Sequence, residues 1–126
     1  MWAILQRLGY SKVLEELNGS KIHRLENLIT LGYDVHMYFD KLLIWFTPTV
    51  CVFSIFFSLS STEGVMQTVS NKYRLETGPA HAYLKRTLPE FVTFTTPDPE
   101  VFPVPSPTYL SIHATCAKIA NLSKCV

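Results

Sequence analysis

The feature that most constrains this fold is an uncharged stretch. Residues 42–62 contain no Asp, Glu, Lys or Arg, and many of them are aromatic or β-branched. About 20 apolar residues are enough to cross a bilayer as a helix, so a single-pass membrane protein is one interpretation. Pro48, several Ser and Thr residues and the β-prone composition argue against such a helix. The flanking Lys and Arg residues favour neither orientation in a membrane.

Length, charge and cysteine content limit the classes of protein to which this chain can belong. The chain has 126 residues, which fits one small domain or a fragment spanning residues 1–126. The formal charge is only +1, which argues against tight binding to nucleic acid. The three cysteines form no CxxC pair and no disulfide framework. The N-terminal residues lack a basic leader and predict no signal peptide, so the default compartment is intracellular, in cytoplasm or nucleus.

Local patterns predict an α+β fold. Apolar residues recur at three- and four-residue steps over residues 2–17, 34–41 and 108–122, which indicates helices. Short β-type runs predict strands at residues 28–31, 43–46, 71–76 and 91–95, with Pro48 ending the second. Residues 81–86 predict one or two helical turns. Five prolines make residues 97–107 an extended linker before the last helix. The strands at 43–46 and 71–76 are expected to form a hairpin that carries the apolar insertion.

Residues 24–46 carry the pattern that bears on function. Asn27 precedes the apolar residues 28–31, and the following helix reads Asp-x-His-x-x-Phe-Asp from Asp34 to Asp40, with His36 and Phe39 inside it. This pattern resembles the second half of an HNH, or ββα-metal, nuclease module. The segments around Phe94 and His113 resemble fungal members of that family. The resemblance implies a partial ββα-metal core with flanking N- and C-terminal helices.

The resemblance also implies the roles of three residues. His36 would ligate a divalent metal (Mg²⁺, Mn²⁺ or Zn²⁺), and Asn27 would brace the loop opposite the general base of the catalytic site. Asp40 follows His36 by four residues, on the same helix face, so it would be a second ligand or would support the first. The activity implied is metal-dependent hydrolysis of DNA, with DNA as partner.

One part of the family's pattern does not match. The general-base histidine and an adjacent ligand should lie well upstream of Asn27, but the only upstream histidine, His23, is four residues away. A strand and a loop do not fit into that interval. We therefore predict a truncated module with weak or no nuclease activity. A non-catalytic interaction remnant is the alternative within the same interpretation.

The resemblance suggests an origin for the apolar run. Removing residues 50–67 joins Thr49 to Thr68 and restores the family's strand, short polar turn and strand. Val50 and Cys51 can be encoded by GTATGT, a frequent fungal splice donor, and Gln67 by CAG, a frequent acceptor. A retained intron is thus a hypothesis that we prefer to the membrane span. If it is translated, such a segment is an aggregation hazard.

Several residues have simpler interpretations beside the chemical ones. His36 can be an ordinary partly buried histidine, Asn27 a turn residue and Asp40 a solvated helix end. His113 lies one helical turn from Cys116, a spacing that suits a metal or a nucleophile–base pair. Core packing is the interpretation we favour for both. His23 is predicted on the surface. Lys85 and Arg86 can contact phosphate, although such charges more often form a solvated face.

Overall fold

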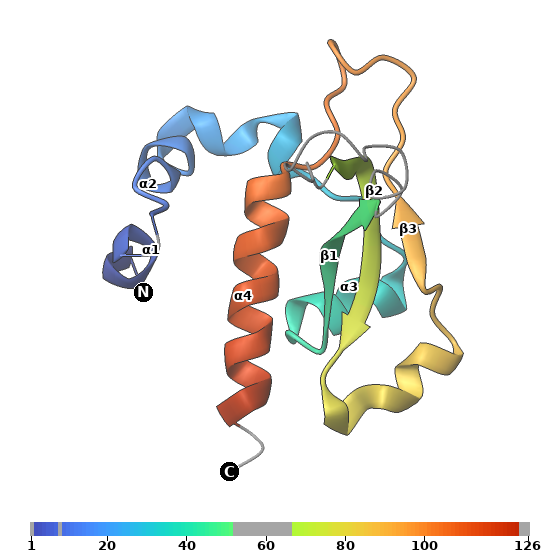
Figure 1. Cartoon of the computed structure of the whole chain (residues 1–126). Coiled ribbons are helices and arrows are strands. Elements are labelled where there is room, and N and C mark those ends of the chain that lie inside the picture. Colours follow the sequence, from blue (N-terminus) through green and yellow to red (C-terminus); the bar gives the residue numbers. More distant parts are fainter. Residues whose placement is uncertain (1, 8, 52–66, 124–126) are drawn as a thin grey trace, which may run out of the picture.

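A computed structural model describes residues 2–7, 9–51 and 67–123 (Figure 1). It confirms the predicted α+β class, because helices flank a three-stranded antiparallel sheet of order β1-β2-β3. In chain order the α-helices, 3₁₀ helices (η) and strands are α1 (Trp2–Arg7), α2 (Val13–Glu16), η1 (Gly19–His23), η2 (Leu25–Asn27), α3 (Tyr33–Asp40), β1 (Ile44–Cys51), β2 (Gln67–Thr77), η4 (Pro79–Arg86), β3 (Phe91–Thr93) and α4 (Pro107–Ser123).

The hairpin of β1 and β2 is the centre of the fold. Its register pairs Ile44 with Thr77 and runs evenly to the pair formed by Pro48 and Tyr73. The register then shifts, and the next pair joins Val50 to Thr68. Between those two pairs β1 contributes one residue and β2 contributes residues 69–72. Asn71, in that irregular segment, has a positive φ of 61°, which Asn tolerates better than most residues.

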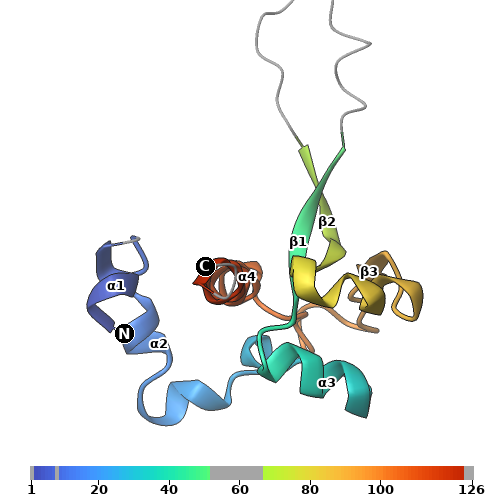
Figure 2. The same cartoon turned by 90° about the horizontal axis from the view of Figure 1, so that it is seen from below.

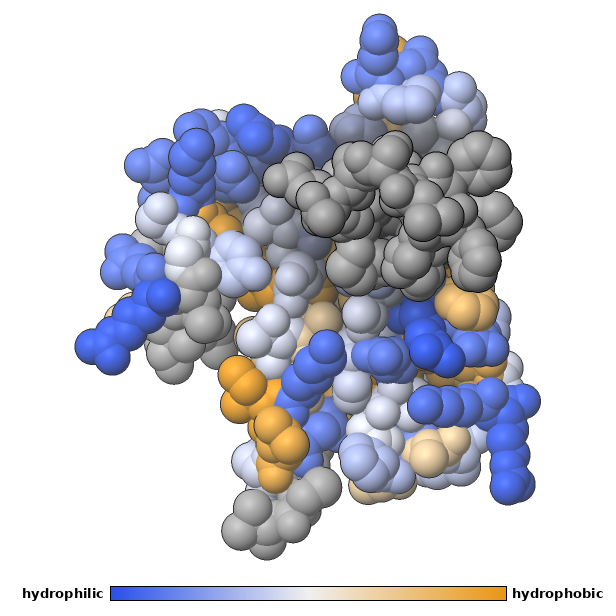
Figure 3. Space-filling view, viewed as in Figure 1, coloured by the Kyte–Doolittle hydropathy of each residue, from blue (hydrophilic) through white to orange (hydrophobic). Residues whose placement is uncertain are grey.

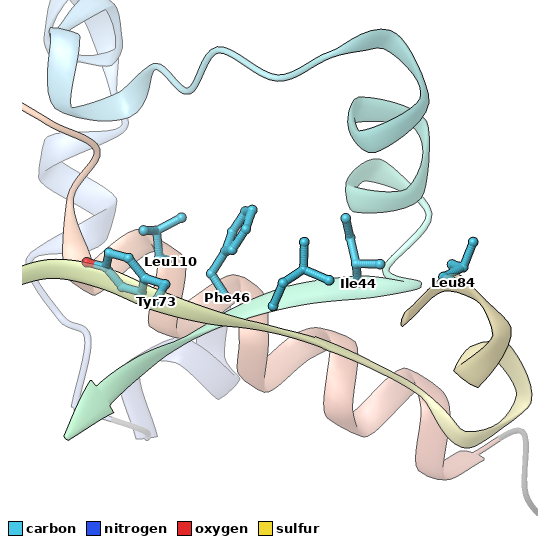
Figure 4. Close-up of a cluster of buried hydrophobic side chains, with 6 residues drawn as sticks. Ile44, Phe46, Tyr73, Leu84 and Leu110 are labelled. Atoms are coloured by element: carbon cyan, nitrogen blue, oxygen red, sulfur yellow. The ribbon is translucent and has the colours of Figure 1, made fainter. Parts of the chain in front are cut away.

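One face of the hairpin carries the main core. Ile44 and Phe46 are the largest fully buried side chains, and Figure 4 shows them on the side of the hairpin that faces α3. Side chains alternate along a strand, so Leu75, the partner of Phe46, and Tyr73, the partner of Pro48, lie on this face as well. The cluster of buried residues comprises Ile44, Phe46, Tyr73, Leu75, Leu84 and Leu110. Burying a side chain of this kind contributes about 1.5–3 kcal/mol.

The opposite face is covered by α4 over only part of its width. Trp45 is buried there against Ala114 and Ala117 of α4. Figure 2 shows α4 and α3 on different sides of β1. The Trp45 indole Nε1 donates to Glu76 Oε2 at 2.9 Å, and the Thr47 hydroxyl donates to the same oxygen at 2.7 Å. Small alanines let α4 lie close to the sheet, so this layer needs no large side chain from the helix.

Asn121 joins α4 to two turns. Its amide Nδ2 donates to the carbonyl oxygens of Leu42 and Ala117, both at 2.8 Å. Leu42 has a positive φ of 59°, so this bond holds a strained turn between α3 and β1. Gly78, after β2, is buried beside the same side chain, and a Cβ at that position would clash with Asn121 Oδ1. The close approach therefore requires glycine at position 78.

Three sequence predictions are wrong, two of them on the elements before α3. The helix predicted for residues 2–17 is broken into α1 and α2, because Gly9 adopts a φ of 86°. Residues 28–31 form no strand: Leu28 is extended, but Ile29 and Leu31 pack against the core as partly buried side chains without joining the sheet. A β-type composition becomes a strand only where a partner strand is available.

Pro48 does not end β1, contrary to the prediction. It lies within the strand and pairs with Tyr73 immediately before the register shift. Proline is tolerated at a sheet edge or beside a bulge because its missing N–H then leaves no ladder bond unmade. Strand β1 is such an edge, since its neighbour in the sheet is β2 alone.

The other elements match their predictions closely. The helices predicted at 34–41 and 108–122 are α3 and α4, and the strand predicted at 71–76 is the central part of β2. The strand predicted at 91–95 is β3, shorter at its C-terminal end. Most of the insertion predicted at 50–67 lies outside the described residues. Within the residues that are described, no helix is long and apolar enough to cross a membrane.

Candidate functional site

Helix α3 presents the two predicted metal-site residues together. His36 Nδ1 lies 3.3 Å from Asp40 Oδ2, and both side chains are more than half exposed. Their i,i+4 spacing produces this pair, as the sequence predicts. In the tautomer whose Nδ1–H points at Asp40, the imidazole Nε2 keeps its lone pair and can bind a metal. The pair thus has the form of one nitrogen ligand with a carboxylate that orients it.

Asn27 lies in η2 and acts within its own loop. Its side-chain Nδ2 donates to the carbonyl oxygen of Ile22 at 3.0 Å and, more weakly, to that of Lys21 at 3.4 Å. These bonds hold η1 against η2. They are the bonds of a turn residue, and the role beside a general base that the resemblance implies for Asn27 stays a prediction. His23, in η1, is exposed, as predicted.

Asn27 and α3 line a common cleft. It has a volume of about 130 Å³ and lies between the loop around Asn27, Phe39 of α3, and the start of α4. Tyr109 and His113 contribute the α4 wall. The Tyr109 hydroxyl donates to Glu16 at 2.6 Å; burial, followed by that bond to a carboxylate, raises the pKa of Tyr109 to about 12. Tyr109 is therefore a neutral donor that ties α2 to α4.

His113 of α4 packs against α3 through Phe39. Its ring stacks on Phe39 with centroids 3.5 Å apart, and its Nε2 lies 2.9 Å from the Phe39 carbonyl oxygen. For that contact to be a hydrogen bond, Nε2 must carry the proton and donate it. Burial lowers the pKa of His113, although the bond to Phe39 and the nearby charge of Asp40 oppose the shift. Nδ1 is buried and has no hydrogen-bond partner among the described residues. These contacts match the packing role that we favoured for His113.

The connection between His113 and α3 is the part of this site that sequence reasoning missed. His113 and Phe39 are 74 positions apart in the sequence, and no local sequence pattern pairs them. Cys116, which the sequence offers as a partner for His113, is a half-buried free thiol. The structure instead joins His113 to the helix that carries His36 and Asp40.

The residues present match only part of a metal site. In the described part of the chain, no group of three or more His, Cys, Asp or Glu side chains is placed to hold a metal ion. Catalytic zinc sites use three protein ligands. His36 and Asp40 can supply one ligand and its support, which allows weak binding of a divalent ion.

Comparisons with protein-family models, with curated proteins and with solved structures find no match to this chain.

Proposed function

We propose that this chain carries the metal-binding helix of an HNH-type nuclease module and that, by itself, it has weak or no nuclease activity. The observation that carries the proposal is the exposed pair on α3, with His36 Nδ1 3.3 Å from Asp40 Oδ2. A histidine oriented by a carboxylate is the usual arrangement of a metal-ligating imidazole. The ion bound there would be Mg²⁺, Mn²⁺ or Zn²⁺, and it would polarise a phosphate of DNA.

The expected low activity follows from the general base. Hydrolysis of a phosphodiester needs a group that takes a proton from the attacking water. In the family that the sequence resembles, this group is a histidine upstream of the Asn27 position. The upstream histidine of this chain, His23, lies in η1 directly beside the loop that Asn27 braces. A metal held by one histidine and no paired base would accelerate cleavage little.

Metal binding is tested first, because it does not require activity. Mn²⁺ is titrated into the folded protein while the imidazole proton signals are followed by NMR. Selective broadening of the His36 signals is expected, and in His36→Ala no imidazole signal of the remaining histidines should broaden in its place. A tenfold or greater loss of affinity is expected for Asp40→Asn, since it removes the support of the ligand. His23→Ala is the matched control, because it removes an exposed histidine outside α3.

Cleavage is tested second, on supercoiled plasmid with Mg²⁺ or Mn²⁺. We expect at most slow nicking, absent in His36→Ala. Rapid metal-dependent cleavage that survives loss of His36 would place the chemistry elsewhere and overturn the proposal. Equal broadening of His23 and His36, or of neither, would remove its basis.

A non-catalytic interaction role is the second candidate. The observation that favours it is the apolar surface of α4, where Ile119 and Leu122 are 57% and 70% exposed (Figure 3). A single-pass membrane protein has less support, because Ile44–Cys51 pairs with β2 in the sheet. Detergent dependence of the purified protein would separate the membrane alternative from both soluble ones.

A further inference from the structure

Within the part of the chain that the structure describes, α4 lies over one half of the sheet face that carries Trp45, and the other half is called the open half. Lys72 and Arg74 of β2 alternate with the buried Tyr73 and therefore point to this face. The register places Phe91 of β3 opposite Arg74 and Thr93 opposite Lys72. Hydrophilic residues are among those that Figure 3 shows on this side of the molecule. The open half is thus a surface with two cations and one aromatic ring.

Phe91 is the unusual member of this surface. Its side chain is 46% exposed, although it lies within a strand. Lys72 Nζ is 5.1 Å and the Arg74 guanidinium carbon 5.8 Å from the centre of its ring. Both distances are within the range of cation–π attraction. An exposed ring with cations at its border can stack a base while the cations contact the adjoining phosphates.

A third cation extends the surface past the end of β2. Arg74 and Lys85 line one cleft of about 180 Å³. The acid in that cleft is Glu90, whose Oε1 lies 2.7 Å from Arg74 Nη2. This ion pair is exposed on both sides, so it is a weak contact that a phosphate can replace. Glu76, a second acid on the described part of this face, already accepts hydrogen bonds from Trp45 and Thr47.

We propose that this surface, defined by Lys72, Arg74, Lys85 and Phe91, binds single-stranded nucleic acid. An unpaired strand is required because Phe91 can stack only on a base whose face is accessible. The chain's net charge of +1 limits the strength of binding, and dissociation constants of about 1–100 µM at low salt are expected. The proposal does not depend on the metal site of α3, which lies on the other side of the sheet.

Binding is measured by fluorescence anisotropy with labelled dT20, U20 and a 20-base-pair duplex, in EDTA so that no metal contributes. Wild type is expected to bind dT20 and U20 and to prefer both to the duplex. Lys72→Gln/Arg74→Gln should lose most of the affinity and reduce the salt slope by about 1.4, for two phosphate contacts. The control Lys12→Gln/Lys21→Gln removes the same charge from exposed positions outside the sheet, and it should retain most of the binding.

Two further variants keep the test independent of folding. Phe91→Leu should weaken binding by about fivefold or more, because stacking is lost while an apolar side chain remains. Glu90→Gln should strengthen binding several-fold, because it releases Arg74 for phosphate; a loss of structure could not produce a gain.

Four results would overturn the proposal. The first is that wild type binds neither dT20 nor U20, and the second is that the two double variants lose equal affinity. The third is that wild type binds the duplex more tightly than single strands and Phe91→Leu has no effect. The fourth is that Glu90→Gln gains no affinity. His36→Ala is included and should bind like wild type. The nuclease proposal and this one can therefore fail separately.

Discussion

Removing residues 50–67 should leave the fold intact. The deletion joins Thr49 to Thr68, and the pair of Pro48 with Tyr73 becomes the innermost pair of the hairpin. The new connection consists of Thr49 and residues 68–72, which include the positive-φ Asn71. The irregular part of β2, which has no counterpart in β1, would thus serve as the turn.

The magnitude follows from the two terms that change. The connection between Pro48 and Tyr73 shortens about fourfold, which lowers the entropy cost of closing it by roughly 1.2 kcal/mol, at about 0.6 kcal/mol for each halving. Against this, the pairs of Val50 with Thr68 and Cys51 with Gln67 are lost. Cross-strand pairs contribute roughly 0.2–1 kcal/mol each. The free energy of unfolding is therefore expected to change by less than about 1 kcal/mol.

Urea denaturation followed by the fluorescence of the buried Trp45 measures this change. A variant in which residues 50–67 are replaced by a Gly/Ser segment of equal length separates length from composition, and it should be the less stable of the two variants. Loss of the cooperative transition, or destabilisation by more than about 3 kcal/mol, would show that the segment is part of the fold, since this exceeds all the lost terms. Sequencing spliced transcripts would then decide whether codons 50–67 are an intron.

Three other predictions concern the framework around the site. Gly78→Ala should destabilise the protein by about 1–3 kcal/mol, because the added methyl group meets Asn121. In a double-mutant cycle with Asn121→Ala, measured by urea denaturation, the two losses of stability should be less than additive, and additive losses would contradict the contact. The pKa of His113 is lowered in the folded state, so the free energy of unfolding should be constant at pH values above the unfolded-state pKa of about 6.5 and should fall as the pH decreases through the folded-state pKa. In a His113→Gln variant, the urea midpoints should lack this pH dependence. Burial alone would raise the pKa of Glu76, but hydrogen bonds from Thr47 and Trp45 and the charges of Lys118 and Arg74 lower it. Glu76→Gln should therefore reduce the free energy of unfolding by about 1 kcal/mol at pH 7, and this difference should disappear at a pH low enough to protonate Glu76 in the wild type.

The sequence predicts the parts of this fold that depend on local pattern. The spacing of apolar residues identifies α3 and α4, and the i,i+4 spacing of His36 and Asp40 predicts their pairing. The errors arise where the outcome depends on distant residues. Residues 28–31 have a β-type composition but no partner strand, and Pro48 is accepted because β1 is an edge. The contact of His113 with Phe39 joins two helices, and its apolar surroundings give no local signal of the partner.

The bond from Asn121 to Leu42 has a consequence for folding during synthesis. It spans 79 residues, and α4 leaves the ribosome after all three strands of the described sheet. Until then Trp45 has no cover, the Leu42 turn has no partner for its carbonyl, and the core lacks Leu110. Contacts of such separation form slowly because a long loop must close first. A nascent chain that pauses before α4 would therefore expose apolar sheet surface next to an aggregation-prone insertion, and it should depend on chaperones more than the released protein does.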